Sequence, residues 1–520
     1  MKHLNNEVIY QIYPLTFNYA SGSKSDPYKG AYGNLKGITA LAPYVASLGV
    51  DTIWITPFYP WGGNGFGYDI TDYTGIDPMY GNAEDLQELC KTFHNLGLRV
   101  LIDQVYNHCS MHHPWFQKSL KKEAPYTDYF IWADAKGYDE NNEPIAPNNW
   151  PSTWSSDGDS VWRWSKKRRQ FYMHSFDYTM PNLNLNNTVV QDELLKVAKY
   201  WFDLGIDGFR LDATTHYACD PLLRDNPLDE NGRQKRIYDI TTQGGADFIN
   251  RLKQLCNSYA TPKTLLAEYW FDKSPESLDK NRKLIKNSGC DAFFLDALNY
   301  KLSDFVKNVS TALSVIPKGE KINWAFSNHD LERAATRLFG NHYTPQKMVM
   351  LMQLLTALPG SICLFQGDEL GLPNPVWFEN CKKPEFDPLN VWTPFSMPWD
   401  AARAGFAMSN TEDDPTRKMA LQPDSRQYDL AVSTQNKPGS TLNRVRKAIA
   451  RRRNSIFNEY GNIYFLNRKK PAEFIAFVRT NADESRKVLC LYNFSDRYVK
   501  LTYKKRTYKL APEKMLIKEL

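Results

Sequence analysis

The stretch "DGFRLDATTH", residues 207–216, begins like a short buried strand and ends in charged and polar side chains. Side chains alternate across a strand, so Arg210 and Asp212 are expected to lie on the same face. A single arginine–aspartate pair at a strand end is more often a structural ion pair than part of a catalytic site. Its meaning therefore depends on whether other strands of the chain end in the same way.

Short apolar runs bounded by turn residues recur along the chain, with helical patterns between them, for example at 83–97 and 189–205. Eight such runs lie at 7–14, 51–57, 99–105, 205–212, 264–270, 290–296, 321–330 and 360–369. Strands that alternate with helices and recur eight times predict an α/β fold, a parallel (β/α)8 TIM barrel.

Two segments do not follow this alternation. Residues 109–185, between the third and fourth runs, are rich in Trp, Pro, Asn and Asp and show no clean period. A structureless loop of that length is improbable, so we predict a subdomain inserted after strand three. Beyond residue 455, short strand-like runs at hairpin spacing predict an antiparallel β-sandwich. The predicted domains are barrel strands one to three at 1–108, the inserted subdomain at 109–185, barrel strands four to eight at 186–455 and the C-terminal β-sandwich at 456–520.

The composition suits a large globular protein. The chain has 520 residues, of which 42% are hydrophobic and 14% aromatic, and such values exclude a disordered chain. The net charge of +6 is small for this size. The densest basic runs, at 166–169 and 451–453, are interpreted as a solvated loop and a helix face. No nucleic-acid-binding motif accompanies them, so we expect no nucleic-acid partner.

The eight cysteines are scattered, with no CxxC pair and no zinc-site spacing. This pattern is typical of free thiols in a reducing compartment. The N-terminal residues lack an apolar signal core, and no apolar run is long enough to span a membrane. We therefore expect a cytoplasmic protein without a membrane partner, unless a signal peptide has been removed. The oligomeric state is left open.

Polar side chains gather where the predicted barrel strands end. In such a barrel the carboxyl ends of all strands meet at one face, which holds the active site. The residues at these ends are Asp103, Asn107, His108, Arg210, Asp212, Glu268, His329 and Asp330.

Several carboxylates at one cleft suit glycoside hydrolysis, in which one carboxylate attacks the anomeric carbon and another protonates the leaving oxygen. We expect Arg210 to hold the pKa of Asp212 down. We expect the apolar side chain of Trp270 to raise the pKa of Glu268. A third carboxylate can support the cationic transition state. If the mechanism is retaining, the carboxyl groups of Asp212 and Glu268 should lie about 5–5.5 Å apart.

Four ordered motifs resemble those of glycoside hydrolase family 13, the α-amylase family. They are "DQVYNH" (103–108), "GFRLDA" (208–213), "AEYW" (267–270) and "FSNHD" (326–330). The stretches at 65–81, 147–150 ("PNNW") and 365–373 resemble the α-glucosidase and oligo-1,6-glucosidase branch of this family. The resemblance implies a retaining hydrolase of α-glucosidic bonds in short oligosaccharides.

The resemblance also implies roles for individual residues. Asp212 would be the nucleophile, Glu268 the general acid/base and Asp330 the transition-state stabiliser. The substrate-binding residues would be Tyr68, His108, Arg210 and His329. Ala213, directly after the implied nucleophile, resembles members that prefer α-1,4 bonds.

Some positions depart from the branch. Gly65 stands where an acidic residue is usual, and residues 390–400 lack the usual arginine, so endo and exo action both stay open. The first βα loop (16–37) lacks an Asp-rich metal loop, and Asp26 alone is a weak ligand set. We expect no cofactor for the chemistry, and this loop does not support a structural calcium ion. Asn107 is either a calcium ligand or a hydrogen-bonding anchor.

Two alternatives remain. A transglucosylase or a trehalose synthase-like isomerase would form the same intermediate and pass it to a sugar hydroxyl, because water exclusion decides between the two outcomes. A non-catalytic scaffold of the same fold is the other alternative. The presence of Asp212, Glu268 and Asp330 argues against a scaffold.

Overall fold

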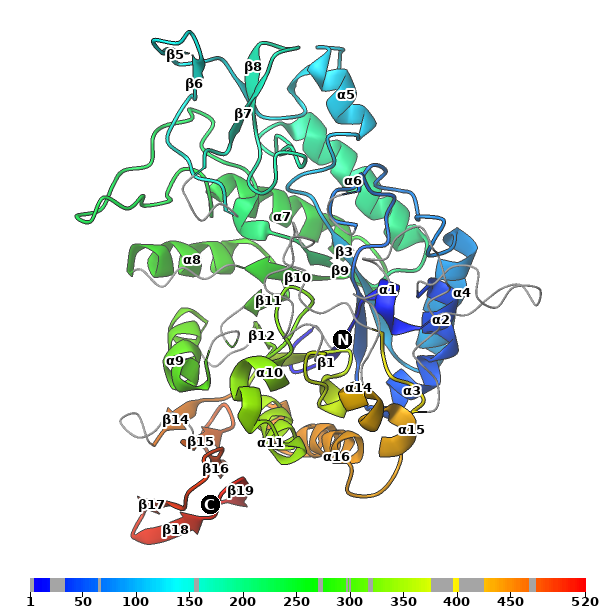
Figure 1. Cartoon of the computed structure of the whole chain (residues 1–520), viewed down its shortest axis with the longest axis vertical. Coiled ribbons are helices and arrows are strands. Elements are labelled where there is room, and N and C mark those ends of the chain that lie inside the picture. The colour runs from blue at the N-terminus through cyan, green and yellow to red at the C-terminus, as the bar shows by residue number, and fades with distance from the viewer. Residues whose placement is uncertain are drawn as a thin grey trace. The chain divides into compact units, whose positions relative to one another are not determined.

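The computed structural model describes residues 4–18, 33–63, 67–153, 159–269, 275–295, 298, 301–316, 321–375, 396–401, 425–466 and 474–520. Eight parallel strands form a closed barrel in the order β1-β13-β12-β11-β10-β9-β3-β2. Six of them, β1, β3, β9, β10, β11 and β12, are labelled in Figure 1. The bounds of all eight are β1 Val8–Ile12, β2 Thr52–Ile55, β3 Arg99–Gln104, β9 Gly208–Leu211, β10 Thr264–Tyr269, β11 Ala292–Leu295, β12 Ile322–Trp324 and β13 Ser361–Phe365. Each lies within one of the eight predicted runs, so the predicted barrel is confirmed.

The barrel strands are almost continuously buried. Every residue of β1, β9 and β13 is buried, as expected for parallel strands covered on both faces. This explains why the strands appear in the sequence as short apolar runs rather than as alternating ones.

Helices follow most barrel strands. The helix α4 (Ala83–Asn95) begins with a capping box between Asn82 and Asp85 and buries Leu86, Leu89 and Phe93. The other helices of the barrel and its C-terminal extension are α1 Pro14–Phe17, α2 Leu35–Ala40, α3 Ala42–Ser47, α6 Thr188–Asp203, α7 Gln243–Asn257, α8 Pro275–Asn287, α9 Phe305–Val315, α10 Ala334–Phe339, α11 Pro345–Leu355, α14 Ser425–Asp429, α15 Val432–Gln435 and α16 Thr441–Arg453. None of the helices in the described ranges is long and apolar enough to cross a membrane.

The chain forms two compact units. One comprises Met1–Thr56, Met79–Val100 and Ala292–Leu520, and the other comprises Pro57–Pro78 and Leu101–Asp291. The second unit contains most of β3, all of β9 and β10, and the segment that follows β3. The residue boundaries of the predicted domains stay predictions.

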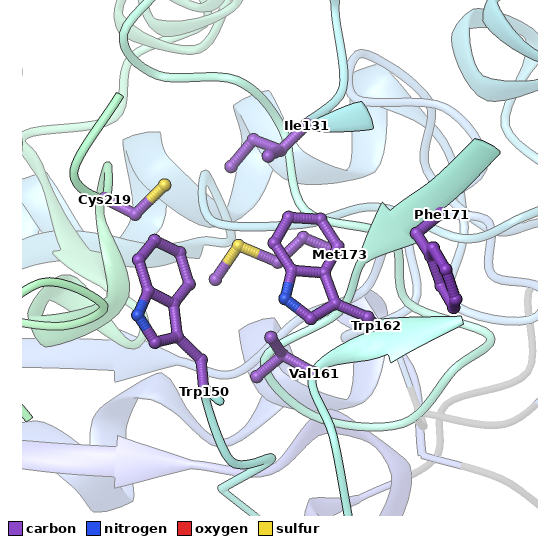
Figure 2. Close-up of a cluster of buried hydrophobic side chains, with 7 residues drawn as sticks. All are labelled: Ile131, Trp150, Val161, Trp162, Phe171, Met173 and Cys219. Carbon is purple, nitrogen blue, oxygen red and sulfur yellow. The ribbon is translucent and has the colours of Figure 1, made fainter. Parts of the chain in front are cut away.

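The described residues of the segment after β3 form a helix and short strands. The segment contains the helix α5 (Pro114–Leu120), a three-stranded sheet in the order β4-β8-β7 and the hairpin β5–β6. The bounds of these strands are β4 Trp132–Ala133, β5 Gly137–Tyr138, β6 Pro144–Ile145, β7 Trp162–Ser165 and β8 Gln170–Met173. Its buried core consists of Ile131, Trp150, Val161, Trp162, Phe171, Met173 and Cys219 (Figure 2).

The "PNNW" motif (147–150) joins this subdomain to the loop after β9. The Nδ2 of Asn148 donates to the Leu223 carbonyl at 3.0 Å, and the Nε1 of Trp150 donates to the Arg224 carbonyl at 2.8 Å. The Nδ2 of Asn149 donates to the Asn226 carbonyl at 2.9 Å. These three hydrogen bonds give backbone carbonyls a donor and fix the motif to the loop. We call this set of contacts the clamp.

The C-terminal region is a β-sandwich, as predicted. A four-stranded sheet in the order β14-β15-β16-β19 and the hairpin β17–β18 share one core, which includes Ala476, Leu489 and Leu510. The bounds are β14 Ile463–Phe465, β15 Phe474–Thr480, β16 Lys487–Asn493, β17 Val499–Tyr503, β18 Arg506–Leu510 and β19 Lys514–Glu519. The strand β19 was not predicted, because three charged residues flank or interrupt its short apolar run "MLI".

Several positions singled out in the sequence lie outside the described residues. They are Asp26, Gly65, Trp270, Cys381 and most of 390–400. The other seven cysteines are buried and free.

Arg452, near the end of α16, is fully buried. Its Nη1 donates to the carbonyls of Thr356 and Leu358 at 2.9 and 2.7 Å, and its Nη2 donates to the carbonyl of Gly360. The neighbouring Arg453 is 41% exposed and pairs with Asp51.

We expect Arg452→Met to lower the free energy of unfolding by about 3 kcal/mol, because it leaves buried carbonyls without donors. The exposed pair of Arg453 is worth at most about 1 kcal/mol, so Arg453→Met is the matched control. Urea unfolding of both variants measures the difference. Equal losses would contradict the assigned role of Arg452.

Candidate active site

One guanidinium at the end of β9 binds three carboxylates. The Nη1 of Arg210 lies 2.6 Å from the Oδ1 of Asp212 and 2.6 Å from the Oδ1 of Asp103, and its Nη2 lies 2.6 Å from the Oε1 of Glu268. Asp103 is the register partner of Arg210 on β3, and Glu268 comes from β10 on the other side. The predicted proximity of Arg210, Asp212 and Glu268 is therefore confirmed, and Asp103 joins them.

The charges of this cluster do not balance, because three carboxyl groups surround one permanent cation. Burial raises the pKa of Asp212 well above its usual value, and Glu268 and Asp103 act in the same direction. Arg210 opposes the rise without reversing it. The predicted effect of Arg210 on the Asp212 pKa is therefore confirmed in direction, and burial outweighs it. Asp212 therefore retains its proton to higher pH than an isolated aspartate would.

Glu268 is held from two further sides. Its Oε2 accepts a hydrogen bond from the Ala213 N–H at 2.8 Å, and its backbone carbonyl accepts one from the Thr214 hydroxyl. Ala213 has a left-handed backbone, with φ of 48° and ψ of 39°. A residue with a Cβ adopts this conformation at a cost. The strained backbone of Ala213 thus places its N–H against the carboxylate of Glu268.

His108 and Tyr68 lie in the same unit. His108 is 2% exposed, and Asn107 Nδ2 lies 3.2 Å from its Nδ1. Burial lowers the pKa of His108 to about 4, even though the Tyr68 backbone favours the charged form. The Tyr68 hydroxyl lies 3.4 Å from the Oδ2 of Asp103. His108 is therefore a neutral hydrogen-bonding group, and Asp103 links Tyr68 to the Arg210 cluster.

His329 and Asp330 follow β12 in the other compact unit. The His329 ring is 4% exposed and lies between the rings of Tyr13 and Trp54, with centroid distances of 6.2 and 6.1 Å. Its Nε2 lies 3.4 Å from the Oδ1 of Asp330, whose side chain is 56% exposed. These two predicted residues therefore contact each other.

Gln11 was missed by sequence analysis. Its Nε2 lies 2.8 Å from the Nδ1 of His329, and both side chains are buried. An amide N–H that donates to Nδ1 leaves the ring proton on Nε2, on the side of Asp330. A polar residue inside the apolar run "EVIYQIYP" (7–14) was the available signal.

Asn107 acts as an anchor in this structure. Its backbone carbonyl accepts from the Leu183 N–H at 2.9 Å, and its Oδ1 accepts from Asn182 Nδ2 at 3.5 Å. Calcium sites need several oxygen ligands together. Over the described ranges, no group of three or more His, Cys, Asp or Glu residues is arranged to hold a metal ion.

Comparisons with known proteins agree with this geometry. A family model described as "Alpha amylase, catalytic domain" matches residues 11–461. A probable alpha-glucosidase of Rhizobium meliloti is 32% identical over 94% of this chain and 89% of its own length. The amino acid transporter heavy chain SLC3A1 of Homo sapiens is 31% identical over 78% of this chain and 59% of its own. Among solved structures, the alpha-glucosyl transfer enzyme XgtA superposes with a TM-score of 0.82 and 30% identity, over 99% of this chain and 98% of its own.

We expect the His108 ring to titrate with a midpoint of about 4. An unfolded histidine titrates near about 6.5, so the unfolded state takes up the proton first as the pH falls. The contribution of His108 to stability is therefore complete above about pH 6.5, and about 3 kcal/mol of it is lost as the pH falls to 4. NMR of ¹⁵N-histidine-labelled protein measures the midpoint, with His108→Gln to assign the signal. A midpoint above 6 would contradict a buried neutral ring.

We expect Gln11→Met to allow the ring proton of His329 to lie on either nitrogen. The substitution removes the donor to Nδ1 and keeps a side chain of similar volume. The ¹⁵N shifts of His329 should then report mixed tautomers, and activity should fall about tenfold, the value of one buried hydrogen bond. Gln104→Met is the matched control, since Gln104 is equally buried and donates to Tyr59 at 3.0 Å. A similar His329 shift change in both variants would indicate general loosening instead.

Proposed function

Because the chain belongs to the alpha-amylase family, we propose that it is a retaining glycoside hydrolase that cleaves α-1,4-glucosidic bonds of short oligosaccharides. The observation that carries this proposal is the Arg210 guanidinium, which holds the carboxyl groups of Asp212 and Glu268 on adjacent nitrogens. Two carboxyl groups bound to one guanidinium are close, as a retaining mechanism requires. The separation of about 5–5.5 Å stays a prediction.

Asp212 is the proposed nucleophile and Glu268 the proposed acid. In the first step an oxygen of Asp212 bonds to the anomeric carbon while the glycosidic C–O bond breaks, and Glu268 gives its proton to the leaving oxygen. In the second step a water gives its proton to Glu268 and its oxygen to the anomeric carbon, which releases Asp212 as a carboxylate. Each residue ends as it began.

Arg210 supports the ionised form of the proposed nucleophile. The reaction needs one protonated and one ionised carboxyl group beside Arg210. Burial raises the pKa of Asp212, and the Arg210 guanidinium opposes this rise. We propose that Arg210 stabilises the Asp212 carboxylate that attacks the anomeric carbon.

The remaining residues are proposed to bind the attacked glucose. The Tyr68 ring would stack on the sugar, and neutral His108, Arg210 and His329 would bind its hydroxyls. Asp330 is the proposed transition-state stabiliser, with its half-exposed carboxylate supporting the positive charge at the anomeric carbon.

A glucosyl-transfer activity is the second candidate. It is favoured by the likeness to the alpha-glucosyl transfer enzyme XgtA and by the departures at Gly65 and 390–400. The similarity to a transporter heavy chain leaves a non-catalytic scaffold as a further alternative. The carboxylates around Arg210 count against it, because a scaffold does not need them.

We further propose that the protein is cytoplasmic and that its substrate chemistry needs no cofactor. The location is supported by the seven free, buried cysteines, which suit a reducing compartment. Dialysis against EDTA is expected to leave the rate of maltotetraose hydrolysis unchanged. A loss of rate that calcium restores would establish a metal requirement.

A product time course from maltotetraose tests the main proposal. Asp212→Asn should lower the rate by roughly a thousandfold or more, and Glu268→Gln by about 10²- to 10⁴-fold. Both variants should keep the unfolding temperature within a few degrees. NMR of the first product should show the α anomer.

The product pattern separates the candidates. Glucose as the first and sole early product means exo hydrolysis, and products longer than maltotetraose mean transfer. A β anomer would overturn the retaining mechanism. Unchanged activity in Asp212→Asn would overturn the assignment of the nucleophile.

A further inference from the structure

The C-terminal end of the chain is strongly basic. Residues 497–520 contain eight lysines and arginines and two glutamates, a net charge of +6. This equals the net charge of the whole chain, so the rest of the chain is electrically balanced. This segment is one of two strongly basic segments of the chain, the other being α16 with six cations and no acidic residue.

Most of this charge lies on one hairpin. The strands β17 and β18 form an antiparallel hairpin (Figure 1). Its side chains Val499, Leu501, Tyr503, Tyr508 and Leu510 pack into the core that the hairpin shares with the four-stranded sheet. Alternation places the exposed residues of the two strands on the opposite face. The exposed cations of the hairpin and its turn are Lys500, Lys504, Lys505, Arg506 and Lys509.

Two of these cations face each other directly. Lys500 and Lys509 are register partners on the outer face of the hairpin. Like charges in this position destabilise a sheet, whereas opposite charges stabilise it. Over residues 474–520, which are all described, no ion pair to any of the five hairpin cations is found. No ion pair within this range therefore offsets the repulsion between Lys500 and Lys509.

An exposed aromatic ring lies beside the lysine pair. Tyr498 is 63% exposed, and the Lys509 ammonium lies 4.5 Å from its ring centroid. Thr502 and Thr507, the next outward pair along the hairpin, place their hydroxyls 3.0 Å apart. The outer face thus combines cations, one open aromatic surface and hydroxyl groups.

We propose that the outer face of the β17–β18 hairpin binds an acidic polysaccharide. Carboxylates along such a chain complement Lys500, Lys509 and the basic turn. The apolar face of a sugar ring fits on Tyr498, and the threonine hydroxyls can bond to sugar hydroxyls. This binding is separate from catalysis and would hold the enzyme at an acidic glycan while its barrel acts on oligosaccharides.

Other polyanions fit less well. Nucleic-acid recognition favours arginine forks and several stacking rings, whereas the hairpin carries four lysines, one arginine and one exposed ring. An anionic membrane is bound more firmly when apolar side chains insert, but the turn consists of Lys504, Lys505 and Arg506.

The substitution Lys500→Glu separates binding from folding. It replaces a repulsive cross-strand pair with an attractive one, so the unfolding temperature should stay the same or rise. It also reverses a charge on the binding face, so affinity for fluorescently labelled polygalacturonate should fall about tenfold at about 50 mM salt. Lys166→Glu makes the same charge change at another exposed lysine and should alter the affinity less than about twofold. Both variants should hydrolyse maltotetraose at the unchanged rate.

Several outcomes would overturn the proposal. They are no binding of the unsubstituted protein to polygalacturonate, equal losses in Lys500→Glu and Lys166→Glu, tighter binding to poly(U) RNA, and tighter binding to vesicles that contain an anionic lipid. The last two would assign the hairpin to nucleic acid or to membranes. Neutral dextran is the control for the charge requirement, and dextran binding as tight as that of polygalacturonate would also count against the proposal.

Discussion

The interaction on which the site depends is the contact of one buried guanidinium with three carboxyl groups. Arg210 is 1% exposed and binds Asp103, Asp212 and Glu268, which come from three adjacent barrel strands. Without the guanidinium, three buried carboxyl groups would face each other with no counter-charge, which is costly at low dielectric. Arg210 therefore stabilises the strand ends and also fixes the positions of the groups that would perform the chemistry.

Hydrogen bonds to neighbouring residues orient Glu268 and His329. The left-handed backbone at Ala213 accompanies an N–H contact to Glu268, and Gln11 contacts the Nδ1 of His329. The clamp formed by the "PNNW" motif joins the inserted subdomain to the loop that follows β9. Each of these contacts gives a polar group a hydrogen-bond partner and restricts the segment that carries it. The same contacts therefore stabilise the fold and hold the site residues in place.

Much of the fold could be predicted because its signals are local. Each barrel strand is a short apolar run with turn residues at its ends, and α4 begins at a capping box that is visible in the sequence. The strand β19 was missed because lysines and glutamate mask its short apolar centre. The strands of the inserted subdomain were missed individually, because their two- to four-residue lengths carry no period.

The sequence by itself determined the order of the elements and the identity of the polar residues at the strand ends. These follow from periodicity, turn residues and motifs, which are read over short stretches of chain. Only the tertiary structure decided which carboxyl groups contact Arg210 and which of them keep a proton. Asp103 and Arg210 are 107 positions apart, and Gln11 and His329 are 318 apart. Burial and the number of carboxylates around Arg210 set the protonation of Asp212, and both depend on which strands become neighbours when the barrel closes.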